Sequence, residues 1–315
     1  MKRILLIRMS SLGDIIHTFP AATDLRRALP DAALDWVVEE SYVPLARMHP
    51  GVTRVLPIAL RRWRRSLFSA RAWREAAAFR RSLREPSYDA ILDTQGLLKS
   101  AAVACLARGP IYGFGRGTAH ESLAARFYDV GYEFAPSDHK VERYRAVAAR
   151  ALGYTPGALD YGIVSPPRPA AAPAVPYCVL LPSTARAAKL WHEEGWIEVG
   201  RHLASCGLAC VLLWGDETER LRAERIAARV PGAVVPARTP LAEAGGLIGH
   251  AQAVIGLDTG FMHLAAALSI PVLGIFCDSE PLDVHPLGSG RTVFRGGVGK
   301  PPSAGEVIAA LAELA

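Results

Sequence analysis

The chain of 315 residues lacks several motifs by which common enzyme classes are recognised. It has no Asp-x-Asp pair to chelate a metal ion, and it has no Gly-x-Ser-x-Gly nucleophile motif. At 299–301 a Gly-Lys pair is followed by Pro, so there is no Walker loop. The glycines at 113–117 lack the third position of the dinucleotide fingerprint, which disfavours an NAD-dependent dehydrogenase.

Long apolar runs and paired cysteine motifs are also missing. No apolar run approaches the roughly 20 residues of a membrane span. The apolar run at 4–7 ends at Arg8 and is too short for the core of a signal peptide. The cysteine count is odd and no Cys-x-x-Cys occurs, which predicts buried, reduced thiols. We therefore expect a cytoplasmic protein.

Positive charge is concentrated in one stretch of the chain. The net charge is +6, and residues 61–84 hold nine arginines against a single acid, Glu75. Because the whole chain has 36 lysines and arginines and 30 acidic residues, the remainder is close to neutral. This distribution indicates one anionic ligand or surface rather than general polycation behaviour.

Apolar runs of strand length alternate with amphipathic runs of helix length, and this alternation occurs twice. Strands are predicted at 2–8, 33–39, 54–58, 88–94, 110–114, 177–182, 208–214, 233–236, 253–257 and 271–276. Helices are predicted at 14–29, 70–85, 96–107, 120–129, 139–152, 193–205, 217–229, 241–250 and 260–268. Nearly continuous apolar strands suit parallel sheets that are covered on both faces.

The sequence therefore predicts an α/β protein with two facing, Rossmann-like, doubly wound parallel-sheet domains. We assign 1–160 to the N-terminal domain and 177–302 to the C-terminal domain, with a stiff linker rich in proline and alanine at 161–176. The pattern Ser303-x-x-Glu306 predicts a capping box that opens a final helix at about 303–315. Open α/β sheets bind ligands beyond the carboxyl ends of their strands, so the site is expected there.

The first candidate site follows the first predicted strand, in the segment Ser10-Ser11-Leu12-Gly13-Asp14. Small residues permit a tight turn, and Asp14 falls at the start of the next predicted helix. One interpretation is that Asp14 caps this helix. The other is that its carboxylate is a general base on an acceptor hydroxyl, although a helix N-terminus lowers its pKa and so weakens the base.

Two further candidates follow strands of the second half. Ser183, Thr184 and Lys189 could bind phosphate oxygens, or they could form an ordinary polar loop. The segment Asp258-Thr259-Gly260 joins a strand to a helix and has the pattern of an anion site at a helix N-terminus. His263 lies one turn into that helix, where a histidine is either a packing residue or a ligand contact.

Asp216 and Glu219 have the spacing of a helix cap, and either carboxylate could instead accept hydrogen bonds from a ribose. Arg61, Arg62, Arg64 and Arg65 form a basic run. Such a run is commonly a solvated face, but here it is the centre of the positive charge. It could receive the phosphates and carboxylates of an acidic acceptor, or lie against an anionic membrane.

With these residues identified, the sequence resembles the lipopolysaccharide heptosyltransferases of the GT-B class, and among them the heptosyltransferase I branch. The matching motifs extend over nearly the whole chain. They lie at 10–18, at 35–40 (Asp-Trp-Val-Val-Glu-Glu), at 61–64 (Arg-Arg-Trp-Arg), at 93–101, at 139–143, at 184–191, at 214–219 and at 258–263.

The resemblance implies a role for each matching position. Asp14 would be the catalytic base, and the donor ADP-heptose would be bound by Ser183, Thr184, Lys189, Glu219, Asp258, Thr259, Gly260 and His263. The acceptor, Kdo-lipid A, would be bound by Ser11, Gly13, Arg61, Arg62, Arg64, Arg65 and His120. The resemblance further implies inversion at the anomeric carbon, no cofactor, no metal ion, and a final helix that packs back on the N-terminal domain. It also implies peripheral contact with the cytoplasmic face of the inner membrane.

Three rival functions are compatible with parts of the sequence. A sister heptosyltransferase would use a different core acceptor. A nucleotide-sugar epimerase of similar fold would consume the donor without an acceptor. A nucleic-acid-binding module would use the arginines for phosphates, but a single Trp63 among them is thin support for base stacking, and we expect no nucleic acid partner.

Overall fold

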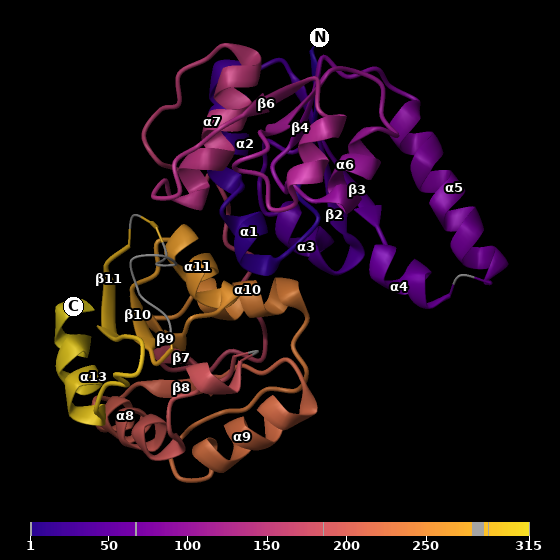
Figure 1. Cartoon of the computed structure of the whole chain (residues 1–315). Helices are drawn as coiled ribbons and strands as arrows, with labels where there is room; N and C mark the ends of the chain where they lie inside the picture. Colours follow the sequence, from indigo (N-terminus) through magenta and orange to yellow (C-terminus); the bar gives the residue numbers. More distant parts are fainter. Residues whose placement is uncertain (1, 67, 185, 279–286, 289, 315) are drawn as a thin grey trace. The chain divides into compact units, whose positions relative to one another are not determined.

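The structure, a computed structural model, describes residues 2–66, 68–184, 186–278, 287–288 and 290–314. The chain forms two compact units, Met1–Ile163 and Val164–Ala315, which differ in colour in Figure 1. The division therefore lies near the start of the predicted linker. No helix within the described ranges has both the length and the apolar character needed to cross a bilayer.

The N-terminal unit contains a parallel sheet in the order β3-β2-β1-β4-β5-β6. Its strands are β1 (Arg3–Ile7), β2 (Ala33–Glu39), β3 (Arg54–Ile58), β4 (Ala90–Asp93), β5 (Ile111–Phe114) and β6 (Val130–Tyr132). Its helices are α1 (Leu12–Ile16), α2 (Phe19–Ala28), η1 (Glu40–Tyr42), α3 (Val43–Ala46), α4 (Leu60–Arg65), α5 (Ala70–Arg84), α6 (Leu98–Ala104), η2 (Ser122–Phe127) and α7 (Lys140–Leu152).

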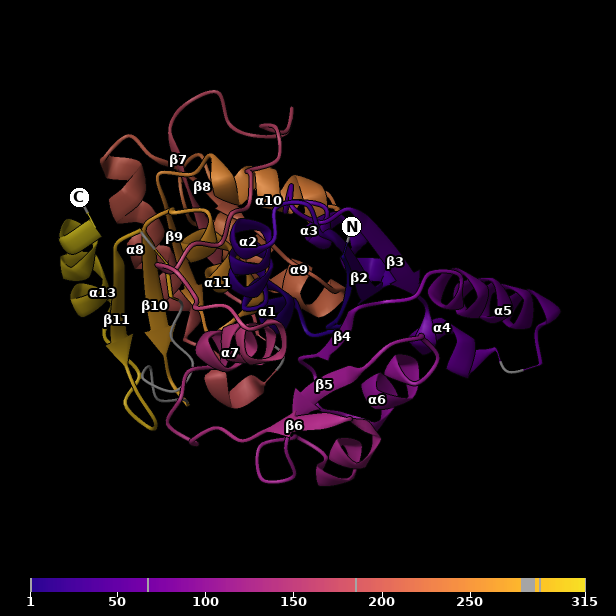
Figure 2. The same cartoon turned by 90° about the horizontal axis from the view of Figure 1, so that it is seen from above.

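Both faces of this sheet are covered, as its continuously apolar strands require. Leu5 and Ile7 of β1 pack in one core with Phe79 of α5 and Ala101 of α6. Because side chains alternate along a strand, the intervening residues face the other side. There α7 packs against β4, β5 and α2, and the rings of α2 and β2 meet at Phe19 and Trp36, 5.6 Å apart. Figure 2 shows α2 and α7 next to each other on this side.

The C-terminal unit contains a parallel sheet in the order β11-β10-β9-β7-β8. Its strands are β7 (Tyr177–Leu181), β8 (Ala209–Leu212), β9 (Ala253–Leu257), β10 (Val272–Phe276) and β11 (Thr292–Gly296). Its helices are η3 (Ala187–Lys189), α8 (Glu193–Ser205), α9 (Glu217–Ala227), α10 (Leu241–Gly249), α11 (Gly260–Ala267), α13 (Ala304–Leu311) and η4 (Ala312–Leu314).

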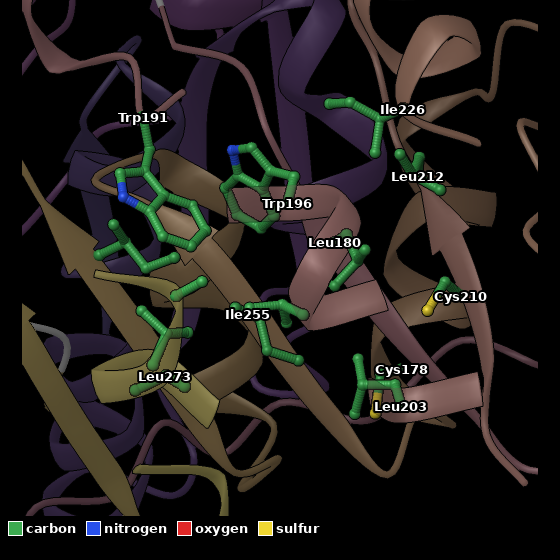
Figure 3. Packing of buried hydrophobic residues seen from close by; sticks show 14 of the residues in the cluster. Cys178, Leu180, Trp191, Trp196, Leu203, Cys210, Leu212, Ile226, Ile255 and Leu273 are labelled. Atoms are coloured by element: carbon green, nitrogen blue, oxygen red, sulfur yellow. The ribbon is translucent and has the colours of Figure 1, made fainter. Parts of the chain in front are cut away.

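The core on one face of this second sheet is built around two tryptophans. Trp191 and Trp196 meet edge to face with ring centroids 5.4 Å apart, and both are fully buried. Figure 3 shows them above aliphatic side chains of the strands, among them Leu180 and Ile255. The indole Nε1 of Trp191 donates to the carbonyl of Pro302 at 2.8 Å, so its polar atom is satisfied inside the core.

The final helix packs within the C-terminal unit, and its expected packing on the N-terminal domain stays a prediction. Val307 and Ala310 of α13 are buried in the core of the C-terminal unit, where α13 packs against α8, β10 and β11. The predicted capping box is present, since Glu306 accepts from the Ser303 backbone N–H at 2.7 Å. The apolar stripe of α13 is thus used within its own unit, and Ala315 lies outside the described residues.

Part of the predicted linker also packs on a helix. A Cβ at Gly246 of α10 would lie 2.5 Å from the carbonyl oxygen of Pro167 and about as close to Pro169. The glycine therefore permits the proline-rich segment to run directly across α10. This part of the predicted linker thus packs on the C-terminal unit, and the stiffness expected from its prolines stays a prediction.

Several predicted elements need correction. The helix expected at 14–29 is broken into α1 and α2, because Pro20 lies in the first turn of α2 and cannot continue a preceding helix. The segment at 120–129 forms the 3₁₀ turns of η2, and residues 233–236 contribute only a bridge at Val234. The strands β6 and β11 and the short helix α4 were not predicted, because their burial pattern is weak.

A buried ion pair fastens α7 to α2. Arg145 donates to Asp24 at 2.7 Å, and both side chains are almost completely buried. Replacing Arg145 with Ala would leave the Asp24 carboxylate buried without its cation, and we expect the N-terminal unit to lose roughly 3–5 kcal/mol of stability. Native-state hydrogen exchange of the β1 and β4 amides measures this loss. The matched control is Arg220→Ala on α9, where the ion pairs are exposed and little change is expected. Equal losses in the two variants would contradict this role of the pair.

Candidate active site

A cavity of about 370 Å³ opens at the carboxyl ends of β1, β4 and β5. These strands are neighbours, and the chain departs in opposite directions after β1 and β4, so the cavity lies at the topological switch point of the sheet. The residues lining the cavity come from the ends of the three strands, the loops after them, α1 and α7: Arg8, Ser10, Ser11, Asp14, Gln95, Leu97, Phe114, Thr118, His120, Lys140, Arg143 and Tyr144.

The loop after β4 is shaped by a buried carboxylate. Asp93 Oδ1 accepts the backbone N–H of Gln95 at 2.8 Å, and its Oδ2 accepts the hydroxyl of Tyr128 at 2.8 Å. Gln95 in turn accepts the backbone N–H of Met9 at 2.9 Å, which joins this loop to the loop after β1. Gly96 has φ +67°, and a Cβ there would press on the Phe114 ring at 3.0 Å, so the turn requires glycine.

The carboxylate of Asp14 has partners on both oxygens. Its Oδ2 accepts from the hydroxyl of Ser11 at 2.9 Å and from the Ser11 backbone N–H at 3.3 Å. Its Oδ1 accepts from Lys140 Nζ at 3.3 Å and from the Tyr144 hydroxyl at 3.2 Å. Asp14 is therefore held by its own loop and by the first two turns of α7.

Asp14 takes part in capping α1, and its role as a general base stays a prediction. The N-cap of α1 is Ser11, not Asp14, which is the third helical residue and returns a hydrogen bond to the cap. This is one half of a capping box. The same carboxylate lines the cavity, so its capping contact orients the side chain that faces any bound molecule.

The pKa of Asp14 lies well below its ordinary value. Burial acts to raise this pKa, but the nearby cations Arg8 and Lys140 and the hydrogen bond from Ser11 together lower it by more. The carboxylate is therefore ionised at neutral pH. Arg8 is buried over the face of the Tyr144 ring, 4.1 Å from its centroid, and burial is the main reason that the pKa of Tyr144 is raised to about 12. Tyr144 thus remains a hydrogen-bond donor to Asp14.

The predicted acceptor residues divide into two groups. Ser11 and His120 line the cavity with Asp14, whereas Gly13 lies in α1 and does not. The arginines of α4 do not line it either, because α4 follows β3 at the far edge of the sheet. Arg62 is already engaged by Glu40 at 2.9 Å and Glu75 at 2.6 Å, while Arg61, Arg64 and Arg65 are exposed.

Several residues of this cavity were not assigned roles from the sequence. Arg8, Gln95, Lys140 and Tyr144 are isolated in the sequence and meet only in the folded unit. Arg8 and Gln95 had one signal in common, their place directly after apolar strands, and Gln95 also lies in the matching motif at 93–101. Lys140 lies within the matching motif at 139–143 and Tyr144 directly follows it, but neither received a role.

The predicted donor residues converge at the carboxyl edge of the second sheet. The segments 183–189, 214–219 and 258–263 follow β7, β8 and β9, which are adjacent in the order β9-β7-β8. The chain departs in opposite directions after β7 and β9, so this edge is the switch point of the C-terminal unit.

The polar groups at this edge suit an anionic ligand. Lys189 Nζ contacts Asp258 Oδ2 at 2.5 Å, and the two side chains are 15% and 12% exposed. The hydroxyls of Ser183 and Thr259 are buried and make no hydrogen bond within the described part of the chain. Thr259 is the N-cap of α11, whose first backbone N–H groups point toward the same edge. A helix N-terminus, an ammonium and two donor hydroxyls form a phosphate site in chemical terms.

The loop that carries Lys189 is anchored at both ends. Arg222 of α9 donates to the carbonyl of Pro182 at 3.0 Å and also to the carbonyl of Trp191. The ring of Trp191 is buried in the core drawn in Figure 3. Because residues on both sides of the loop are held, Lys189 is presented at a defined place at the edge of the sheet.

Glu219 and His263 have local roles in the described structure. Glu219 accepts the backbone N–H of Gly215 at 2.7 Å, and Asp216 caps α9 by accepting from the Glu219 N–H at 2.9 Å. The capping interpretation of Asp216 is therefore confirmed. Glu219 holds the turn after β8, and His263 is buried one turn into α11.

Comparison with known proteins places this arrangement in a family. The model of glycosyltransferase family 9 (heptosyltransferase) matches residues 76–308. The chain is 42% identical over 282 residues to lipopolysaccharide heptosyltransferase 1 of Pseudomonas aeruginosa, covering 89% of this chain and 79% of that protein. The structure of E. coli heptosyltransferase WaaC with ADP has a TM-score of 0.90 and 35% identity, covering 99% and 100% of the two chains. The same enzyme with ADP-2-deoxy-2-fluoro heptose has a TM-score of 0.88 and 36% identity, with equal coverage.

Two parallel-sheet units, each with a polar site at its switch point, define the protein as a glycosyltransferase of the GT-B class. More particularly, the chain belongs to glycosyltransferase family 9, the heptosyltransferases.

The ion pair between Lys140 and Asp14 yields a prediction about pH. Replacing Lys140 with Ala removes one of the cations that stabilise the Asp14 carboxylate, so the pKa of Asp14 should rise toward its ordinary value of about 3.9. Carbon-13 NMR titration of the carboxyl resonance that disappears in Asp14→Asn measures the shift. Lys140→Arg keeps the cation and is the control. An unchanged pKa of Asp14 in Lys140→Ala would contradict this prediction and show that Arg8 and Ser11 are sufficient to keep that pKa low.

Proposed function

We propose that this glycosyltransferase moves heptose from ADP-L-glycero-D-manno-heptose to the Kdo of Kdo-lipid A, with inversion at the anomeric carbon. Two findings support this assignment. The chain is 42% identical in sequence to a protein named lipopolysaccharide heptosyltransferase 1, and its structure is similar to that of WaaC bound to ADP and to an ADP-heptose analogue. The observation that carries it is a pair of sites: an ionised carboxylate in one unit, and in the other an ammonium with two hydroxyls that make no hydrogen bond to the described residues.

In this proposal the C-terminal unit binds the donor. Lys189, Ser183, Thr184 and the N-terminus of α11 receive the pyrophosphate, and Glu219 and His263 contact the nucleoside and sugar. Lys189 has three donor hydrogens, so it is able to keep Asp258 while it contacts phosphate. As ADP leaves, negative charge grows on its phosphate, and only contacts that strengthen with that charge accelerate the step. Asp258 and Gly260 keep these groups in position at the start of α11.

Asp14 acts as the general base in this proposal. It takes the proton from a Kdo hydroxyl while the oxygen forms a bond to the anomeric carbon and the bond to ADP breaks. The low pKa of Asp14 in the free protein makes it a weak base. An acceptor is anionic and compensates the cations that lower this pKa, and Lys140, whose side chain is 54% exposed, is free to turn toward the acceptor. Acceptor binding thus raises the basicity of Asp14 in the complex.

The remaining acceptor contacts follow from the cavity and the basic helix. Ser11 and His120 line the cavity with Asp14. Gly13 lies beside Asp14 in the first turn of α1 and would contact the acceptor there. Arg61, Arg64 and Arg65 bind acidic groups further along the acceptor, while Arg62 stays in its ion pairs. Because the acceptor is a lipid, we place the enzyme in the cytoplasm, peripheral to the inner membrane.

The direct test is release of ADP from ADP-heptose, measured with and without Kdo-lipid A. We expect release only when the acceptor is present. Donor consumption without acceptor would favour a nucleotide-sugar epimerase. Transfer to a different core oligosaccharide, with none to Kdo-lipid A, would favour a sister heptosyltransferase.

Replacing Asp14 with Ala should lower turnover by about 10²–10⁴-fold, the usual contribution of a positioned general base. The affinity for ADP should barely change, because Asp14 belongs to the other unit from the donor residues. Initial rates and calorimetry measure the two quantities. Asp31→Ala, an exposed change in the same unit, is the control. Turnover like that of the unmodified enzyme would refute the assignment of Asp14.

Replacing Lys189 with Ala should weaken ADP binding by roughly 10- to 100-fold, the range expected for a lost hydrogen bond to a charged group. The upper part of this range is expected because the Asp258 carboxylate then lacks the Lys189 cation beside the phosphates. Calorimetry with ADP measures it, and Lys300→Ala on the exposed surface of the same unit is the control. Unchanged ADP affinity would remove Lys189 from the phosphate site.

A further inference from the structure

A second basic cavity lies on the N-terminal unit. It has a volume of about 580 Å³ and is lined by Ala77, Arg80, Arg81, Arg84 and Glu85 from α5 and its end, and by Arg108 from the loop after α6. No residue of this cavity also lines the cavity around Asp14. The four guanidinium groups therefore form a distinct site, which we call the α5 groove.

The charge of the α5 groove is not neutralised by the protein. Within the described residues, none of its four arginines forms an ion pair with a carboxylate. The arginines nearer the start of the basic stretch differ, since Arg62 and Arg71 both contact Glu75. Glu85 is the single acid at the groove. Four cations against one acid in one concavity attract an anion with several oxygens.

The helix that carries the groove, α5, has an apolar face toward the core and a second face with a line of arginines and a tryptophan. Ala72, Phe79 and Leu83 face the core, as the helical period requires. On another face, Trp73, Ala77, Arg80 and Arg84 follow one another at intervals of three or four residues, so they form one line along the helix.

At one end of this line the Trp73 side chain is 66% exposed, and Phe68 just before the helix is fully exposed. Figure 1 shows α5 at the outer edge of the N-terminal unit, beside α4.

An exposed aromatic ring in line with arginines, with a second exposed ring just before the helix, is the pattern of a helix that lies on a membrane. The rings enter the boundary between headgroups and acyl chains, and the arginines contact the phosphates. We propose that the α5 groove binds the phosphate headgroups of an anionic lipid bilayer and docks the enzyme on it. This inference rests on the proposed function only because a lipid acceptor requires a membrane contact. The inference assigns that contact to α5 and not to α4.

The experiment is co-sedimentation of the full chain with vesicles of phosphatidylglycerol and phosphatidylcholine, or of phosphatidylcholine alone. We expect binding to the anionic vesicles only, falling steeply as salt is raised. The groove variant is Arg80→Gln, Arg81→Gln, Arg108→Gln. Each basic residue at an anionic surface contributes roughly a fivefold factor, so the partition coefficient should fall on the order of a hundredfold.

Two matched variants separate the groove from overall charge. Arg80→Lys, Arg81→Lys, Arg108→Lys keeps the charge and should bind nearly as well as the unmodified chain. Arg220→Gln, Arg225→Gln, Arg229→Gln, on α9 and just after it, changes the net charge equally but alters arginines that are ion-paired, and should retain binding. Quenching of tryptophan fluorescence by brominated lipid should largely disappear in Trp73→Phe.

The outcomes distinguish this inference from the proposed function. Anionic vesicles that bind the groove variant as well as the unmodified chain would overturn the assignment to α5 while leaving transfer of heptose untouched. Failure of the unmodified chain to bind any vesicle, with acceptor-dependent ADP release intact, would overturn the docking inference alone.

Competition identifies the ligand of the α5 groove. Displacement from vesicles by millimolar inorganic phosphate would mean that a free anion is the ligand. Displacement by micromolar oligonucleotide would mean that it is nucleic acid. Either result would overturn the membrane assignment.

Discussion

The structure depends on one constraint, namely that the strands of each sheet run parallel. Parallel strands require a crossover after each strand, so every loop that follows a strand opens at the same edge of its sheet. Where the chain turns first one way and then the other, two neighbouring loops diverge and leave space between them. In the N-terminal unit this happens between β1 and β4, and in the C-terminal unit between β7 and β9. Both clusters of polar side chains lie at these two places.

Each cluster contains a charged group held by opposite charge. Asp14 is ionised because Arg8, Lys140 and Ser11 outweigh the effect of burial. Lys189 lies against Asp258 in the other unit. Such pairing keeps the two groups charged and oriented in the free protein. In the function proposed above, anionic substrates would compete for the cations and so make Asp14 more basic, which would link substrate binding to the chemical step.

The arginines of the N-terminal unit fall into groups with different surroundings. Arg145 is buried and pairs with Asp24 to join α7 to α2, whereas Arg62 of α4 makes partly exposed pairs. Those of the α5 groove have no carboxylate partner within the described ranges. A composition count treats all of them alike. Their neighbours decide whether each one stabilises the fold, neutralises an acid or presents charge to a ligand.

Much of the architecture could be predicted from the sequence, because its determinants are local. Apolar runs such as 177–181 identify parallel strands, and Ser303 with Glu306 identifies the start of α13. Elements with weak burial were missed for the same reason: the exposed strand β6 has no apolar period to detect. The motif around Asp14 and the three segments after β7, β8 and β9 were also found, since position after a strand is a property of the chain itself.

Tertiary structure alone decided which side chains meet. Lys140 and Tyr144 contact Asp14 although they lie more than 120 positions further along the chain. The residues next to them in the sequence do not indicate this contact. The apolar stripe of α13 indicated that the helix packs somewhere, but only the fold placed it in the C-terminal core. The sequence by itself determined the periodicities and the loops that follow strands, which depend on residues close together in the chain, and it determined the total charge, which depends on composition alone. Partners, burial and the resulting pKa values depend on distant ones, which come together only when the chain folds.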